Sequence, residues 1–210
     1  MVVGSTELLH LLEKIADRIE ENKEYLTELD LAIGDADHGL NMDRGFQAVK
    51  ARFGGWSTQT PSQILKGVGS TLVSTVGGAS GPLYGTAFLS MGQAIDGKER
   101  IASEDLLPLA EAAIAGIIKR GKASAGDKTM LDTILPVRDA LSSLLYGGEA
   151  DAGAAIAKAA REGMESTKPL LALKGRASFL KERSIGHIDP GAASACLIIE
   201  AAVDFLREHA

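Results

Sequence analysis

The segment Asp30-Leu-Ala-Ile-Gly-Asp-Ala-Asp-His-Gly-Leu-Asn-Met-Asp-Arg44 places three carboxylates within eight positions, at Asp30, Asp35 and Asp37. Gly34 can adopt backbone angles that are closed to other residues, so the chain can turn there and bring the three aspartates to one side. Carboxylates held that close repel one another unless a cation lies between them. Because oxygen ligands favour hard cations, the pattern predicts magnesium or calcium rather than zinc.

A purely structural interpretation of this segment remains open. Asp-rich turns are common on protein surfaces, and an aspartate before an apolar helical run is often only a helix cap. The spacing does not fit an EF-hand, because no glutamate occupies the twelfth loop position counted from Asp30 or from Asp35. Magnesium, with phosphate oxygens completing its coordination shell, is therefore the first prediction.

Length and composition predict one domain that spans residues 1–210, since 210 residues with 45% hydrophobic content can build one substantial core. The formal net charge is −6 and there is no basic block, which argues against a nucleic-acid partner. No secretory signal is visible at the N-terminus. The longest apolar stretch, near residues 192–199, is too short to span a bilayer. We therefore expect a cytoplasmic protein without a membrane partner.

Apolar residues recur at three- and four-residue spacing through most of the chain, as in the first run with Leu8, Leu12, Ile15 and Ile19. About eight such segments, without convincing two-residue alternation, predict an all-α fold that forms a compact bundle or ring. Between residues 172 and 188 the periodicity fails and the segment is basic. Helix boundaries are predicted at four further places: a start at Thr60-Pro61, an end at Gly54-Gly55, a cap at Gly126-Asp127 and a start at Asp189-Pro190.

Three glycine-containing helix starts, at residues 38–39, 78–81 and 189–191, predict phosphate binding. Helix starts gather unpaired N–H groups and the positive end of the helix dipole. If the helices run up and down, these starts can meet at one end and face the aspartates, with Ser80 and Arg176 on phosphate oxygens. The alternative is that the glycines only separate helices and that Arg176 is a solvated surface charge.

Three other side chains also allow two interpretations each. His38 can orient a loop or transfer protons, and Met130 can belong to the core or cover an adenine ring. Cys196, the single cysteine, lies among small and aliphatic residues, so a buried structural role is the ordinary explanation.

Five motifs follow one another along the chain: Asp30-x4-Asp35-x-Asp37-His38-Gly39, Gly77-Gly-Ala-Ser-Gly-Pro-Leu-x-Gly85, Gly126-Asp-Lys-Thr-Met-Leu-Asp132, Lys174-Gly-Arg-Ala-Ser178 and Asp189-Pro-Gly191. This ordered set resembles the L subunits of dihydroxyacetone kinases, which are the nucleotide-binding subunits of those enzymes. The resemblance covers essentially the whole chain. Relatives often carry glycine where this chain has Ala36, a change that removes some backbone freedom but no ligand.

The resemblance implies an eight-helix antiparallel up-and-down barrel with a nucleotide bound across one end. It implies that Asp30, Asp35 and Asp37 bind two magnesium ions that hold the phosphates of ADP or ATP. It also implies a set of nucleotide contacts: His38, Gly39, Leu40, Asn41, Ala79, Ser80, Gly121, Met130, Arg176, Asp189, Pro190 and Gly191.

For function, the resemblance implies a subunit of a phosphotransferase-system dihydroxyacetone kinase in glycerol metabolism. A phosphocarrier (M) subunit would rephosphorylate the bound ADP, and the γ-phosphoryl group would pass to dihydroxyacetone held on a K subunit, giving dihydroxyacetone phosphate. This chain would itself carry no catalytic acid or base, and the metals and Arg176 would position the phosphates. Two alternative functions are left open: a binding module that docks a transcription regulator, and a paralogous kinase subunit for another hydroxylated substrate. A homodimer is also possible.

Overall fold

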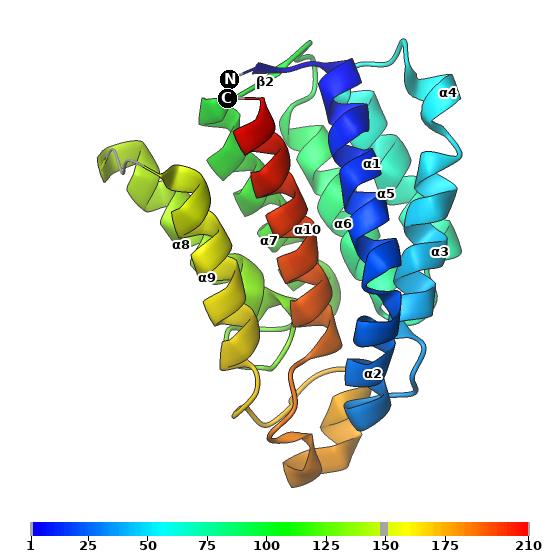
Figure 1. Cartoon of the computed structure of the whole chain (residues 1–210), viewed down its shortest axis with the longest axis vertical. Helices are drawn as coiled ribbons and strands as arrows, with labels where there is room; N and C mark the ends of the chain where they lie inside the picture. Colours follow the sequence, from blue (N-terminus) through cyan, green and yellow to red (C-terminus); the bar gives the residue numbers. More distant parts are fainter. Residues whose placement is uncertain (1, 148–150, 210) are drawn as a thin grey trace.

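The protein is described by a computed structural model that covers residues 2–147 and 151–209, without the side chains of residues 145–147. It is all-α, as expected, apart from one short two-stranded ribbon (Figure 1). The helices are α1 (Ser5–Glu21), α2 (Lys23–Ile33), α3 (His38–Lys50), α4 (Phe53–Trp56), α5 (Pro61–Thr75), α6 (Ser80–Ala94), α7 (Leu106–Gly121), α8 (Met130–Gly147), α9 (Ala152–Ser166) and α10 (Pro190–Glu208). The 3-10 helices are η1 (Ser103–Asp105) and η2 (Arg176–Ser184), and the strands are β1 (Val2–Val3) and β2 (Ile101–Ala102).

The long helices form a ring in chain order. α1 packs against α3, α3 against α5, and so on through α6, α7, α8, α9 and α10, and α10 returns to pack against α1. The helix α4 is a single turn. The helix α2 begins one residue after α1 ends, and it lies at the end of the ring away from both termini (Figure 1). The eight-helix count of the expected barrel stays a prediction. We call this arrangement the helical ring.

Apolar side chains fill the inside of the helical ring. The predicted stripe of α1 is buried at Leu8, Leu12, Ile15 and Ile19, and Phe205 of α10 is also fully buried. Burial of this kind contributes about 1.5–3 kcal/mol per large side chain. The ring is therefore held by the apolar faces that the periodicity predicted. None of the described helices is both long enough and apolar enough to cross a bilayer.

Two of the expected helix starts are confirmed in atomic detail. Thr60 caps α5, where its hydroxyl accepts a hydrogen bond from the backbone N–H of Gln63 at 3.4 Å. Asp189 caps α10, where its carboxylate accepts from the N–H of Ala192 at 2.8 Å. In both cases a proline follows at the first helical position, where it has no N–H to leave unpaired.

Two expected boundaries are wrong. Gly54-Gly55 does not end the run that follows the aspartates, because α3 ends at Lys50 and both glycines lie inside α4. Gly126-Asp127 does not cap α8. The carboxylate of Asp132 instead accepts from the N–H of Gly126 at 2.5 Å and from that of Thr129 at 2.8 Å. An acid in the first turn of the helix therefore organises the preceding turn, and α8 begins at Met130.

Residues 168–186 form a loop that lies at the end of the molecule away from both termini, where Figure 1 shows η2 in orange. We call it the cap loop. Its Ala172 and Ala177 are buried against Ile33 of α2, so the cap loop is anchored to the segment that leads into the aspartates. The loss of helical periodicity predicted between residues 172 and 188 corresponds to this loop.

Candidate functional site

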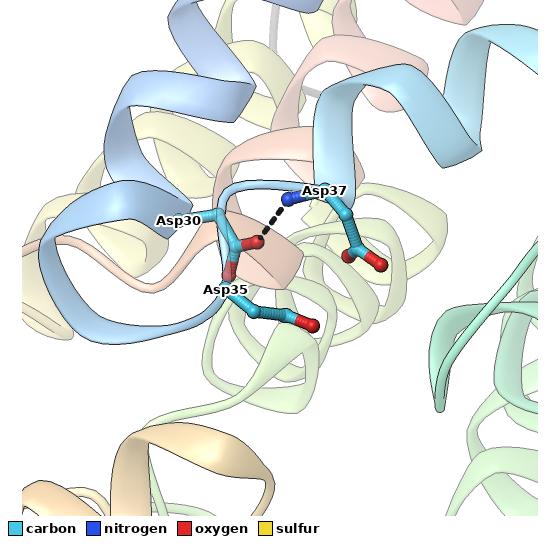
Figure 2. Close-up of side chains that lie close together, drawn as sticks. All are labelled: Asp30, Asp35 and Asp37. Carbon is cyan, nitrogen blue, oxygen red and sulfur yellow. Dashed lines mark hydrogen bonds between the residues drawn. The ribbon is translucent and has the colours of Figure 1, made fainter.

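The three aspartates meet where α2 ends and α3 begins. One carboxylate oxygen from each lies within 4.8 Å of the others, and Figure 2 shows the side chains of Asp35 and Asp37 extending from the connecting loop beside Asp30. Asp30 is buried, at 7% exposure, and its Oδ2 accepts from the N–H groups of Asp37 at 2.8 Å and His38 at 3.1 Å. Both of these hydrogen bonds end on Oδ2. The loop therefore holds Asp30 in place while Oδ1 stays available to a ligand.

The backbone of this loop is shaped by two small residues. A Cβ atom at Gly34 would lie 2.0 Å from Oδ1 of Asp30, so only glycine leaves room for that carboxylate. Ala36 has φ 60°, in the left-handed region that favours glycine. Strain of this kind costs about 1–2 kcal/mol, and it is kept where the surrounding structure fixes the conformation. The departure from glycine noted in the sequence therefore falls on a strained position.

A buried chain of hydrogen bonds joins the starts of three helices beside the aspartates. The imidazole of His38 lies 3.1 Å through Nδ1 from the hydroxyl of Ser80 and 2.9 Å through Nε2 from that of Ser194. Tyr84 reaches the same Ser194 hydroxyl at 2.7 Å and donates to the carbonyl of Gly191 at 3.2 Å. Burial lowers the pKa of His38, because a charged imidazole would lose its water. The lowered pKa favours the neutral imidazole, which joins Ser80 of α6 to Ser194 of α10.

These elements line a cavity of about 430 Å³. Thirteen of the fifteen site residues that the sequence singled out lie in its wall: Asp30, Asp35, Asp37, His38, Asn41, Ala79, Ser80, Gly121, Met130, Arg176, Asp189, Pro190 and Gly191. The wall contains polar groups, the aspartates and the starts of α6 and α10, and also apolar side chains such as Leu83, Ile117, Ala123 and Met130. Such a cavity suits a molecule that carries both an anionic group and a flat apolar group.

Gly39 and Leu40 are the two predicted site residues outside this wall. Gly39 is buried between helices, where a Cβ atom would lie 2.0 Å from the carbonyl oxygen of Lys23. Its lack of a side chain lets α3 approach α2. Leu40 points outward with 57% of its surface exposed, so it also does not join the buried stripe of its helix. Their contact with a nucleotide stays a prediction.

Charge is distributed unevenly around the cavity. The guanidinium of Arg176, from the cap loop, forms an ion pair with Asp35 at 3.0 Å. Burial raises the pKa of Asp189 to about 7, partly offset by its hydrogen bond from the N–H of Ala192 and by the positive charge of Lys128. Asp30 has no cationic partner among the described ion pairs. A buried carboxylate without a counter-charge, beside two more acids, is the donor set that a divalent cation fits.

Tyr84, Lys128 and Ser194 are among the wall and support residues to which the sequence reasoning gave no role. Tyr84 follows Ser80 by four positions, so it faces the same side of α6, and this spacing was a signal that could have been used. Lys128 was visible only as part of a motif. Ser194 sits in a run of small residues that gives no sign of a hydrogen-bond partner on α3 or α6.

Comparison with known proteins gives consistent matches. Residues 32–204 match the DAK2 domain family. A Listeria innocua protein named PEP-dependent dihydroxyacetone kinase 1, ADP-binding subunit DhaL, is 48% identical over 92% of this chain and 92% of its own. An Escherichia coli protein named PEP-dependent dihydroxyacetone kinase, ADP-binding subunit DhaL, is 42% identical over 95% of this chain and 96% of its own.

A solved structure supports the fold. The crystal structure of the dihydroxyacetone kinase from C. freundii in complex with AMP-PNP and Mg2+ matches 97% of this chain and 34% of its own, with a TM-score of 0.72 and 23% identity. At that identity the likeness shows the fold alone. The sequence matches extend over most of the chain, and the two relatives align over nearly their full lengths. The chain therefore belongs to the DAK2 domain family, among the DhaL-type subunits of dihydroxyacetone kinases.

Proposed function

We propose that this chain is the nucleotide-binding subunit of a phosphoenolpyruvate-dependent dihydroxyacetone kinase and that ADP or ATP occupies the cavity together with magnesium. One observation carries the proposal: a cluster of three carboxylates and the starts of two long helices, α6 and α10, border the same 430 Å³ cavity. Acids and anion-binding helix starts side by side suit a phosphate whose charge is balanced by a cation.

Asp30, Asp35 and Asp37 are the residues that would hold magnesium, and two ions is the number we expect. Asp30 is fixed by backbone hydrogen bonds to Oδ2, whereas Asp35 and Asp37 are more exposed. The Arg176 ion pair shows that Asp35 is within reach of the cap loop. Arg176 would add a positive charge at the same place, with the planar donor geometry that suits a phosphate.

The remaining contacts divide between the two ends of a nucleotide. Ser80, held by His38, and the N–H groups of Ala79 and Gly191 would contact the phosphates. Met130 and Gly121, which belong to the same cavity wall, would cover the adenine ring. The lowered pKa of His38 favours its neutral form, which can position Ser80 without adding charge.

When bound, the magnesium nucleotide would supply the phosphoryl relay, with ADP as acceptor from an M phosphocarrier subunit and ATP as donor to dihydroxyacetone on a K subunit. The residues of this chain then have to neutralise and align the phosphates. Phosphoryl transfer is accelerated mainly by positioning and charge, so no general base is required from this chain. The docking of a transcription regulator and the homodimer stay open alternatives, and the cytoplasmic location stays a prediction.

Retention of nucleotide tests the proposal directly. The protein is purified with magnesium throughout, denatured, and the supernatant is chromatographed. We expect close to one adenine nucleotide per chain, and much less after a parallel purification with EDTA. Protein without nucleotide in both preparations would contradict the proposal.

Reconstitution tests the reaction and the substrate. The chain is combined with purified K and M subunits and the phosphoenolpyruvate-dependent carrier proteins, and dihydroxyacetone phosphate is measured. Formation of that product only when all components are present supports the kinase. Phosphorylation of another hydroxylated substrate, with none of dihydroxyacetone, would indicate the paralogous kinase. Nucleotide binding without any transfer would favour a binding module.

A further inference from the structure

Lys128 is an unusual residue for the wall of this cavity. Its side chain is only 1% exposed, and its backbone has φ 61°, in the left-handed region. Burial of an ammonium group is costly because the charge loses its water, and burial lowers the pKa of Lys128 accordingly. A lysine kept in such a position, with a strained backbone, needs a compensating role.

The ammonium group of Lys128 bonds to both ends of the cap loop. Nζ donates to the carbonyl of Thr167 at 2.7 Å, just before the loop, and to the carbonyl of His187, just after it. The two ends also bond to each other, since the N–H of Gly186 donates to the carbonyl of Lys168 at 2.8 Å. The side chain of Lys128 therefore joins the two chain segments that form the base of the cap loop.

Further bonds extend this connection to the neighbouring segments. The N–H of Leu173 donates to the carbonyl of Asp127, the residue before Lys128, at 3.1 Å. The hydroxyl of Thr167 accepts from the N–H of Asp189 at 3.0 Å, so the base of the loop is tied to the residue that caps α10. The positive charge of Lys128 also lies close enough to favour the charged form of Asp189. The position of α10's start and that of the cap loop thus depend on the same lysine.

We propose that Lys128 is a positioning residue that clamps the base of the cap loop and thereby holds Arg176 and the start of α10 against the cavity. Its own charge acts on backbone carbonyls and not on a substrate. The first part of this role, the closed state of the cap loop, needs no ligand. The second part, the retention of ADP, rests on the proposed function.

Limited trypsin digestion of the nucleotide-free protein tests the first part. The cap loop offers Lys174, Arg176, Lys181 and Arg183 as cleavage sites, and mass spectrometry identifies each cut. In Lys128→Met the apolar stem is kept and the donors are lost. Hydrogen bonds from a charged donor are among the stronger ones, so their loss should make cleavage within residues 168–186 about tenfold faster or more. Cleavage elsewhere should keep its wild-type rate.

Lys122→Met is the matched control, because Lys122 is also a lysine with a left-handed backbone, φ 53°, but is exposed and lies outside the cavity wall. It should digest as the wild type does. Lys128→Arg keeps the charge and the donors and should restore a large part of the protection. A general weakening of the fold would instead raise cleavage along the whole chain, and arginine would not rescue the loop specifically.

Release of ADP tests the second part. Proteins loaded with magnesium and radiolabelled ADP are dialysed, and Lys128→Met should lose the label about tenfold faster than wild type and Lys122→Met. Wild-type protein that never retains ADP, together with faster loop cleavage in Lys128→Met, would refute the proposed function and leave the clamp standing. Equal loop cleavage in Lys128→Met and Lys122→Met overturns the clamp. If neither Lys128→Met nor Lys128→Arg folds, the lysine supports the whole chain, and the positioning role is overturned as well.

Discussion

The helical ring and the site end of the molecule are held by different kinds of contact. The ring is closed by apolar faces, with side chains such as Leu12, Ile64 and Phe205 at no more than 1% exposure. The site end also buries apolar side chains, but it holds most of the buried polar groups. Nine of the twelve buried polar or charged residues among the described positions belong to it: Asp30, His38, Asn41, Lys128, Asp132, Thr133, Thr167, Ser184 and Ser194. Apolar contacts tolerate small shifts, whereas hydrogen bonds require specific partners, so changes at the two ends should have different consequences.

The largest effect on stability is expected in the ring, from Phe205→Ala. Phe205 is fully buried near the C-terminal end of α10, far along the helix from the cavity. Removal of a buried phenylalanine costs about 3–5 kcal/mol, which urea denaturation followed by circular dichroism measures as a lower free energy of unfolding. Val73→Ala, at a side chain with 47% exposure, is the control and should cost well under 1 kcal/mol. Nucleotide retention of folded Phe205→Ala should match wild type, and its selective loss would break the separation of the two ends.

The opposite pattern is expected from Asp35→Asn. This change keeps the shape of the side chain and removes one of three charges, so we expect magnesium-dependent ADP retention to fall by about 100-fold, a loss of about 2.7 kcal/mol of binding free energy. In EDTA the melting temperature should hardly change, because the ion pair with Arg176 is largely exposed and contributes little. Asp139→Asn, at an exposed side chain beside Arg138, is the control. Unchanged retention would remove Asp35 from the metal site.

The sequence was sufficient to predict most of the ring. Helical periodicity depends on contacts of one helix face, and this is a local property that Leu8, Leu12, Ile15 and Ile19 display. Two boundaries were wrong because glycine was taken as a helix terminator or cap. At Gly126 the decisive group is the carboxylate of Asp132, six residues later, and at Gly54 the chain simply forms another turn.

The site end was predictable only in part. The aspartates and the helix starts are visible as local patterns, and the structure brings thirteen predicted residues to one cavity wall. Lys128 and Ser194 act through partners 39 to 156 residues away, which no local pattern specifies. Gly39 is a different case. It belongs to a local pattern that suggests binding, but the packing of α3 on α2 by itself requires a glycine at this position.

A smaller effect is expected on the pH dependence of stability, through Asp189. Its pKa of about 7 in the folded protein exceeds the ordinary value of 3.8, so the folded state binds a proton more tightly than the unfolded state does. The contribution of this group to stability is therefore full below about pH 4 and is lost as pH rises through 7. The Asp189→Asn variant can still cap α10. Between pH 5 and 8 we expect its free energy of unfolding to fall by about 1–2 kcal/mol less than that of the wild type. Urea titrations in EDTA at several pH values measure this, and parallel curves for the two proteins would show that Asp189 is ionised throughout.

The smallest effect, and one of opposite sign at the two ends, is expected from alanine-to-glycine changes. Ala36 has φ 60°, so Ala36→Gly relieves left-handed strain and should raise the free energy of unfolding by about 0.5–1 kcal/mol, after the greater freedom of glycine in the unfolded chain is deducted. Ala115→Gly, at an exposed position inside α7, should lower it by about 1 kcal/mol, because glycine is a poor helix former. Urea denaturation in EDTA compares the two, and ADP retention should be unchanged in both. A loss of stability in Ala36→Gly similar to that in Ala115→Gly would mean that the aspartate loop stores no strain, and the contrast between a relaxed ring and a constrained site end would then rest on hydrogen bonding alone.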